Sequence, residues 1–89
     1  MYTAQERMVR RRLRRLRRRV EGDDRAAIDR ALSDDEVLGM LTCDCCAAAG
    51  ISESESEGYG NALTDFFEWL LANQDEIIAF IKTIIGLFT

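Results

Sequence analysis

The sequence predicts a small all-α protein, and three observations favour this class. The chain has no proline, its aromatic residues are few, and its hydrophobic residues recur mostly at helical spacing. Its 89 residues are enough for one small domain, and a chain of this size buries only about 60 % of the surface that its unfolded form exposes. We therefore expect an extended, oligomeric molecule of four segments, in which partners complete the core.

Residues 1–20 are predicted to form an arginine-rich helical arm. Val9, Leu13 and Leu16 follow the heptad spacing of a narrow coiled-coil seam, with Glu6 at the next seam position. The other faces carry nine of the twelve basic residues of the chain. Because like charges one turn apart cost about 0.2–0.5 kcal/mol per pair, the arm should fray alone and fold against a polyanion.

Nucleic acid is the predicted partner of this arm. Arginine binds phosphate bidentately and stays charged at any working pH, and contacts to phosphate do not read base sequence. Residues 21–89 hold fifteen of the sixteen acidic residues, so the acidic half of another copy, or another acidic protein, is the first alternative partner, and an anionic membrane is the second. The predicted nucleic-acid-binding residues are Arg7, Arg10, Arg11, Arg12, Arg14, Arg15, Arg17, Arg18 and Arg19.

Residues 21–50 are predicted to form short helices. Gly22 interrupts the arm, and the hydrophobic residues after it return at helical spacing. Ser33 and Glu36 have the spacing of a capping box, which predicts that a new helix begins at Ser33. Gly50 is the expected end of this helix, because glycine accepts the left-handed conformation that closes helices.

Three cysteines, Cys43, Cys45 and Cys46, lie too close together for a disulfide framework, which favours a reducing compartment. They supply at most part of a zinc site, since the chain has no histidine and no second cysteine cluster. Small buried thiols are the preferred interpretation, with metal binding, redox chemistry or lipidation as alternatives. We predict no metal and no cofactor, and the missing histidine also argues against an enzyme, with no catalytic residue indicated.

Residues 51–60 form a low-complexity stretch of serine, glutamate and glycine. Such a segment cannot bury enough hydrophobic surface to offset the entropy of ordering. We predict a solvated acidic linker; a phosphoacceptor tract and a lid over the arginines are the alternatives.

Residues 61–89 are predicted to form one long amphipathic oligomerisation helix with Asn61 at its N-cap. Its hydrophobic side chains fill an arc of about 200°, which is too wide for one neighbour. The longest apolar stretch, residues 77–88, is shorter than the about 20 residues that a membrane span needs. The predicted interface with other copies or larger proteins consists of Leu63, Phe66, Phe67, Leu70, Ile77, Ile78, Ile81, Ile84, Ile85 and Phe88.

The final stretch, F-F-E-W-L-L-A-N-Q-D-E-I-I-A-F-I-K-T-I-I-G-L-F-T, resembles the C-terminal ends of small uncharacterised bacteriophage proteins. With the arginine-rich arm, this resemblance implies a small structural virion component that touches the packaged genome or occupies a symmetric position in a capsid or tail. The resemblance implies no catalytic residues. The expected location is the virion or the cytoplasm of the host cell, since the N-terminus lacks the apolar core of a secretory signal peptide.

A membrane-active, holin-like or pore-forming subunit is the alternative function. In that case the last segment would form a ring with Asp65, Glu68, Asp75 and Glu76 turned towards water. A small DNA-binding regulator is a third hypothesis, but the sequence shows no signature of a recognition helix.

Overall fold

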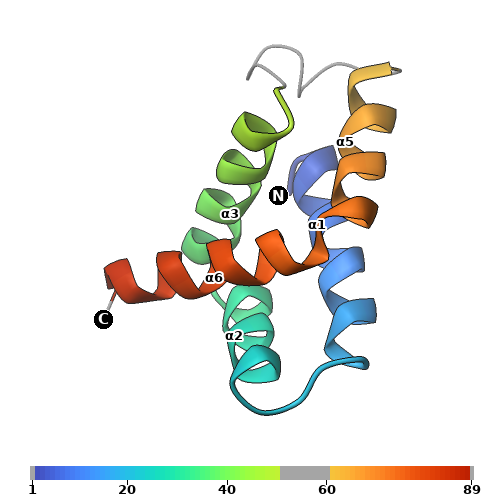
Figure 1. Cartoon of the computed structure of the whole chain (residues 1–89). Helices are drawn as coiled ribbons and strands as arrows, with labels where there is room; N and C mark the ends of the chain where they lie inside the picture. Colours follow the sequence, from blue (N-terminus) through green and yellow to red (C-terminus); the bar gives the residue numbers. More distant parts are fainter. Residues whose placement is uncertain (1, 51–60, 89) are drawn as a thin grey trace.

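Five helices make up the part of the chain that the computed structural model describes, residues 2–50 and 61–88 (Figure 1). They are α1 (Ala4–Arg17), α2 (Gly22–Ser33), α3 (Asp35–Ala48), α5 (Asn61–Ala72) and α6 (Gln74–Phe88). No strand occurs in these two ranges, so the predicted all-α class is confirmed. The predicted linker, residues 51–60, lies outside the described residues.

The helices pack into a compact body, so the expected extended shape is wrong. The radius of gyration is 12.2 Å, with principal extents of 36 × 25 × 22 Å, and about 12 Å is typical of a folded domain of this length. α1 contacts α2, α3 and α5, while α6 contacts α2, α3 and α5. The arginine-rich helix is therefore packed into the body, and its seam meets helices of its own chain in place of a coiled-coil partner.

A capping box starts α1 at Thr3 and Glu6. The Glu6 amide donates to Thr3 Oγ1 at 3.1 Å, and the Thr3 amide donates to Glu6 Oε1 at 2.9 Å. These two bonds satisfy amide groups that the helix itself cannot pair. Glu6 thus caps the helix and does not extend the hydrophobic seam.

The capping box predicted at Ser33 and Glu36 is wrong by one residue. Asp34 is the N-cap of α3, and its Oδ1 accepts from the amides of Glu36 at 3.0 Å and Val37 at 3.4 Å. The Ser33 hydroxyl instead donates to the Arg30 carbonyl at 3.2 Å. A carboxylate is as good a cap as a hydroxyl and is additionally favoured by the helix dipole, so it takes the site. At the other end of α3, Gly50 has a φ of +77° and its amide donates to the Ala47 carbonyl, as expected of a glycine that closes a helix.

The predicted single helix over residues 61–89 is two helices that meet at Asn73. The Asn73 side-chain amide donates to the Trp69 carbonyl at 2.8 Å, and the Asn73 carbonyl accepts from the Ile77 amide at 3.1 Å. One residue therefore closes α5 and opens α6, which suits asparagine because its side chain competes with regular helix bonding. The wide hydrophobic arc is divided between two helices with different neighbours: α5 packs on α1, and α6 packs across α2 and α3 (Figure 1).

One hydrophobic core joins all five helices of the described residues. Its most deeply buried large side chains include Leu13, Ile28, Leu41, Phe66 and Ile81, one from each helix, and each is 0 % exposed. This core fixes the orientation of α1, which carries most of the arginines of the chain.

Candidate nucleic-acid interface

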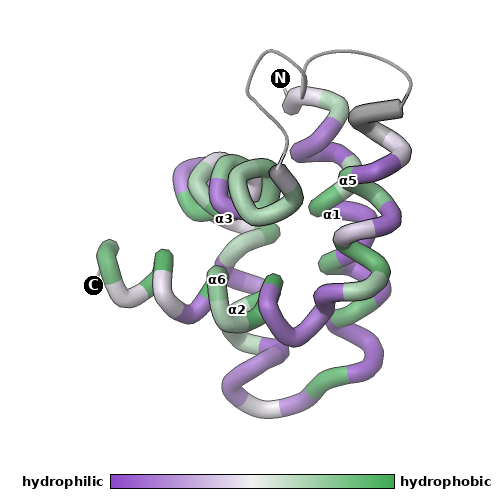
Figure 2. Tube along the Cα trace, turned by 45° about the horizontal axis from the view of Figure 1, so that its top comes forward, coloured by the Kyte–Doolittle hydropathy of each residue, from purple (hydrophilic) through white to green (hydrophobic). Residues whose placement is uncertain are grey.

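Helix α1 buries one narrow face and leaves most of its charge outside. Val9, Leu13 and Leu16 are at most 5 % exposed, and their spacing of four and three residues places them on one side of the helix. Figure 2 shows hydrophilic and hydrophobic residues interspersed along α1, as an amphipathic helix at a protein surface requires. The buried face decides which arginines can reach a ligand.

Four exposed arginines form a stripe on the opposite side of α1. Their spacing of four, three and four residues aligns them along the helix, and the stripe is about 16 Å long at 1.5 Å per residue. None of the four side chains forms an ion pair within residues 2–50 and 61–88. We call this stripe the outer arginine face; it consists of Arg7, Arg11, Arg14 and Arg18.

Arg10 and Arg17 lie outside the outer arginine face, on the flank of α1 that contacts α2. Arg10 Nη1 donates to the Leu32 carbonyl at 3.0 Å, and Arg17 forms an ion pair with Asp29. The Arg10 guanidinium also lies 4.5 Å from the centroid of the Tyr2 ring. These two of the nine predicted nucleic-acid-binding arginines therefore hold α1 in place, and the Tyr2 ring is occupied by a cation.

Arg12 is the exception in the arginine run, because it is only 8 % exposed. Its Nε is buried and has no hydrogen-bond partner in the part of the chain that the structure describes. Burial, followed by the charges of Arg19 and Arg15, lowers the pKa of Arg12 from its ordinary value, but an arginine remains charged at neutral pH. The sequence contained a signal for this burial, since Arg12 lies about 40° around the helix from Leu16.

The predicted interface on the last two helices is largely used inside the chain. Phe66, Leu70, Ile77, Ile81 and Ile84 are at most 1 % exposed, so they are not available to another copy in this structure. The structure leaves two of the predicted residues more open, Phe67 at 37 % and Phe88 at 41 % exposed. Ile78 and Ile85 are half-buried, and Leu63 lies outside the residues whose side chains are described.

Three hydrophobic residues outside the predicted interface are also exposed: Met40, Leu71 and Leu87. Leu71 lies one turn after Phe67 on α5. Leu87 belongs to the last turn of α6, which extends away from the other helices (Figure 2). A helical wheel drawn for one continuous helix over residues 61–89 could not separate Leu71 and Leu87 from the buried residues, and Met40 lies on α3.

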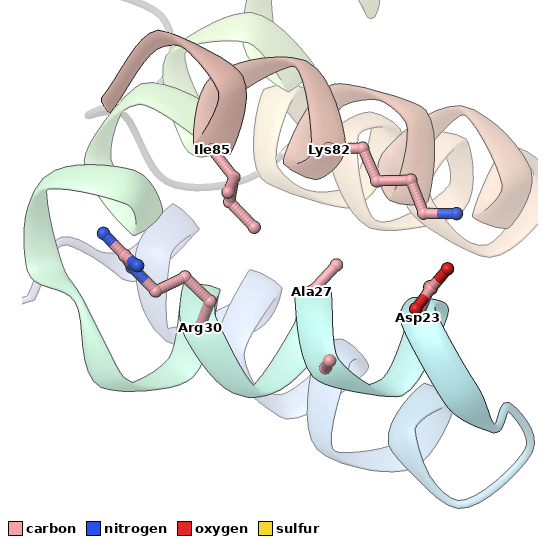
Figure 3. Close-up of a pocket in the computed structure, with 6 residues that line it drawn as sticks. Asp23, Ala27, Arg30, Lys82 and Ile85 are labelled. Atoms are coloured by element: carbon pink, nitrogen blue, oxygen red, sulfur yellow. The ribbon is translucent and has the colours of Figure 1, made fainter. Parts of the chain in front are cut away.

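A groove of about 390 Å³ lies between α2 and α6 (Figure 3). Ala27 and Ile85 face each other across it, with Asp23 and Lys82 at one end and Arg30 at the other. Two of these charges already have partners, because Lys82 pairs with Asp24 and Arg30 pairs with Asp34. The groove is therefore lined by hydrophobic side chains in its middle, and the two cations at its ends are paired with carboxylates.

The cysteines point in different directions. Cys45 and Cys46 are buried and Cys43 is exposed. Burial raises the pKa of the Cys45 thiol to about 12, with smaller contributions from Cys46, Asp44 and Glu76. Two of the three thus behave as small buried thiols, and no group of three metal-ligating side chains comes together in the described residues.

None of the described helices has the length and hydrophobicity needed to cross a bilayer. Comparison of the chain with protein-family models, with curated proteins and with solved structures finds no match.

Proposed function

We propose that this chain is a small structural component of a viral assembly, of the bacteriophage kind, that binds nucleic acid through the outer arginine face of α1. The observation that carries the proposal is an exposed arginine stripe, without an ion pair among the described residues, on a helix whose opposite face is fixed in a folded core. Like charges at one-turn spacing repel each other, and the acidic residues of the described body do not neutralise them. A ligand with regularly spaced negative charges would remove this repulsion.

The phosphate backbone of nucleic acid fits this stripe. A single strand of duplex DNA carries one phosphate per 3.4 Å of helix axis, so a stripe of about 16 Å faces roughly five phosphates. Binding would release condensed counterions and would depend strongly on salt. Because no aromatic residue lies between Arg7 and Arg19 and the Tyr2 ring is covered by Arg10, contacts to bases have little to contribute and binding should be independent of sequence.

Two features of the C-terminal helices α5 and α6 support a role in a larger assembly. The C-terminal stretch resembles bacteriophage proteins, and Phe67, Leu71 and Phe88 leave hydrophobic surface for other copies or larger proteins. In this proposal α1 meets the genome and the exposed residues of α5 and α6 meet protein.

Salt-dependent DNA binding tests the proposal, with single substitutions in place of a deletion. Removing residues 1–20 would also remove Val9, Leu13 and Leu16 from the core, so a deletion would confuse unfolding with loss of contact. Arg14→Gln should lower the slope of log affinity against log salt by about 1, and the Arg11→Gln, Arg14→Gln double variant by about 2. Fluorescence anisotropy with unrelated DNA sequences of equal length measures both the slope and the absence of sequence preference.

Arg25→Gln is the matched control, because Arg25 is exposed on α2 and its loss changes the net charge equally. It should leave the slope unchanged. If Arg14→Gln and Arg25→Gln weaken binding equally, the outer arginine face is not the contact. If the Arg14 variant instead abolishes self-association at low salt and leaves DNA affinity intact, the stripe binds an acidic protein surface.

A further inference from the structure

A second group of arginines lies beside the outer arginine face and differs from it because one of its members, Arg12, is buried. Arg12, Arg15 and Arg19 are spaced three and four residues apart, which places them on one flank of α1 near its C-terminal end. Arg19 follows the helix, and its amide still donates to the Leu16 carbonyl at 2.9 Å, so it continues the last turn. We call these three residues the arginine cluster.

The arginine cluster occupies a flank of α1 on which none of the other arginines of the helix lies. Arg10 and Arg17 bind α2, and Tyr2 at the start of α1 donates to Asp35 of α3 at 2.7 Å. The remaining helix in contact with α1 is α5, which runs beside it in Figures 1 and 2. The arginine cluster therefore lies on the flank of α1 that faces away from α2.

The charges of the arginine cluster have no counterpart in the described part of the chain. Arg12 is 8 % exposed and its Nε has no hydrogen-bond partner. No carboxylate in residues 2–50 or 61–88 forms an ion pair with Arg12, Arg15 or Arg19. The charges of Arg15 and Arg19 are close enough to lower the pKa of Arg12. A buried guanidinium held next to two like charges is costly unless an anion joins them.

We propose that the arginine cluster of Arg12, Arg15 and Arg19 is a binding site for one phosphoryl group. Three planar guanidinium groups offer many donors in fixed directions, and a phosphoryl group can accept from all three, whereas a carboxylate has only two oxygens to share. The site lies at the C-terminal end of α1, where the helix dipole disfavours anions. The side chains must therefore supply the attraction, and the affinity should depend on all three.

The arginine cluster deepens the function proposed above and rests on it only for the source of the phosphoryl group. Arg14 and Arg15 are neighbours in sequence, as are Arg18 and Arg19, so a nucleic-acid strand along the outer arginine face passes directly beside the arginine cluster. One phosphate held there would fix the position of the strand on α1, whereas the outer arginine face alone allows it to slide. The group bound is either a phosphodiester of the strand or a terminal phosphomonoester.

Side-chain NMR of the full chain tests this site at the atom in question. The ¹H–¹⁵N resonance of Arg12 Nε, assigned from its disappearance in Arg12→Lys, is followed during titration with inorganic phosphate, with chloride at equal ionic strength as the reference. We expect a saturable shift with phosphate and none with chloride. Arg15→Lys and Arg19→Lys, at exposed positions, should each weaken phosphate binding by about ten-fold because lysine loses the bidentate geometry. Arg25→Lys should not change it.

Oligothymidylates with and without a 5′-phosphate then identify the source. A shift of Arg12 with both oligomers supports a phosphodiester ligand, and a shift with the phosphorylated oligomer alone supports a phosphomonoester. If phosphate moves Arg12 but neither oligomer binds, the site stands and the nucleic-acid function fails. If the oligomers bind through Arg14 while Arg12 remains unmoved by oligomer and by phosphate, the function stands and the site is wrong.

Discussion

α1 and α6 have the most different compositions of the described helices, yet they are anchored in the same way. Each buries three hydrophobic side chains at a spacing of four and three residues, Val9, Leu13 and Leu16 in α1 and Ile77, Ile81 and Ile84 in α6. The remaining positions are mainly arginine in α1, whereas half of them are hydrophobic in α6. Three hydrophobic positions thus anchor each helix in the core, while the exposed positions determine what kind of surface the helix presents: cationic in α1 and partly hydrophobic in α6.

The largest expected effect tests whether the two anchors are equivalent. Leu13→Ala and Ile81→Ala each remove a side chain that is 0 % exposed, and each should lower the free energy of unfolding by about 2–5 kcal/mol. Urea denaturation followed by circular dichroism measures both. A loss below about 1 kcal/mol for Leu13→Ala alone would show that α1 is a detachable arm, and the comparison with α6 would fail.

A smaller effect is expected on the pH dependence of stability, which depends on how completely α6 covers α3. The Cys45 side chain on α3 is 0 % exposed. Besides burial, the negative charge of Glu76 on α6 contributes to raising the pKa of the Cys45 thiol. Burial raises the Cys45 pKa from 9.0 to about 12, so the folded state favours the neutral thiol. This stabilisation is complete below pH 9 and is lost as the pH rises towards 12, with a loss of about 1 kcal/mol expected at pH 10.

Urea midpoints at pH 7 and pH 10 measure this slope. Cys45→Ala should flatten it, while Cys43→Ser, at an exposed position, should leave it in place. A thiol reagent at pH 8 should accordingly label Cys43 quickly and Cys45 only on unfolding. Equal labelling of both in the folded protein is incompatible with the sealed packing of α3.

The smallest effect is expected at the end of α6. Leu87 is 70 % and Phe88 41 % exposed, so Leu87→Ser and Phe88→Ser should each change stability by at most about 0.5 kcal/mol. Ile84→Ser, one turn earlier and 1 % exposed, should be severely destabilising because it buries a hydroxyl and leaves a cavity. If the variants at Leu87 and Phe88 are equally severe, a partner covers this turn, and sedimentation would show the oligomer dissociating.

Periodicity in the sequence was sufficient to predict helices, the seam of α1 and the end of α3 at Gly50. It failed where one side chain outweighs the pattern. Asn73 divides a hydrophobic pattern that is otherwise continuous, and its effect depends on a bond to the Trp69 carbonyl that has no signature in the spacing. Once that break is missed, the hydrophobic arc is too wide for one neighbouring helix, and the sequence predicts an extended shape in place of the compact body.

The arginines show the same limit for the candidate site. Composition identified the cationic segment but treated nine arginines as equivalent. Their separation into an outer arginine face, two residues bound to α2 and a cluster around Arg12 depends on which helices lie on each flank of α1. That arrangement is tertiary, so no count of charges could supply it.

The contact of α1 with α5, and of α2 with α6, also governs when the protein can fold during its synthesis. Phe66 and Ile84 complete the same core as Leu13, so this core cannot close until the ribosome has released residue 84. Until then α1, which is translated before the other described helices, has its seam open to the surroundings. Native structure is therefore acquired after translation of α6, and the arginine-rich helix is translated well before its hydrophobic partners on α5 and α6.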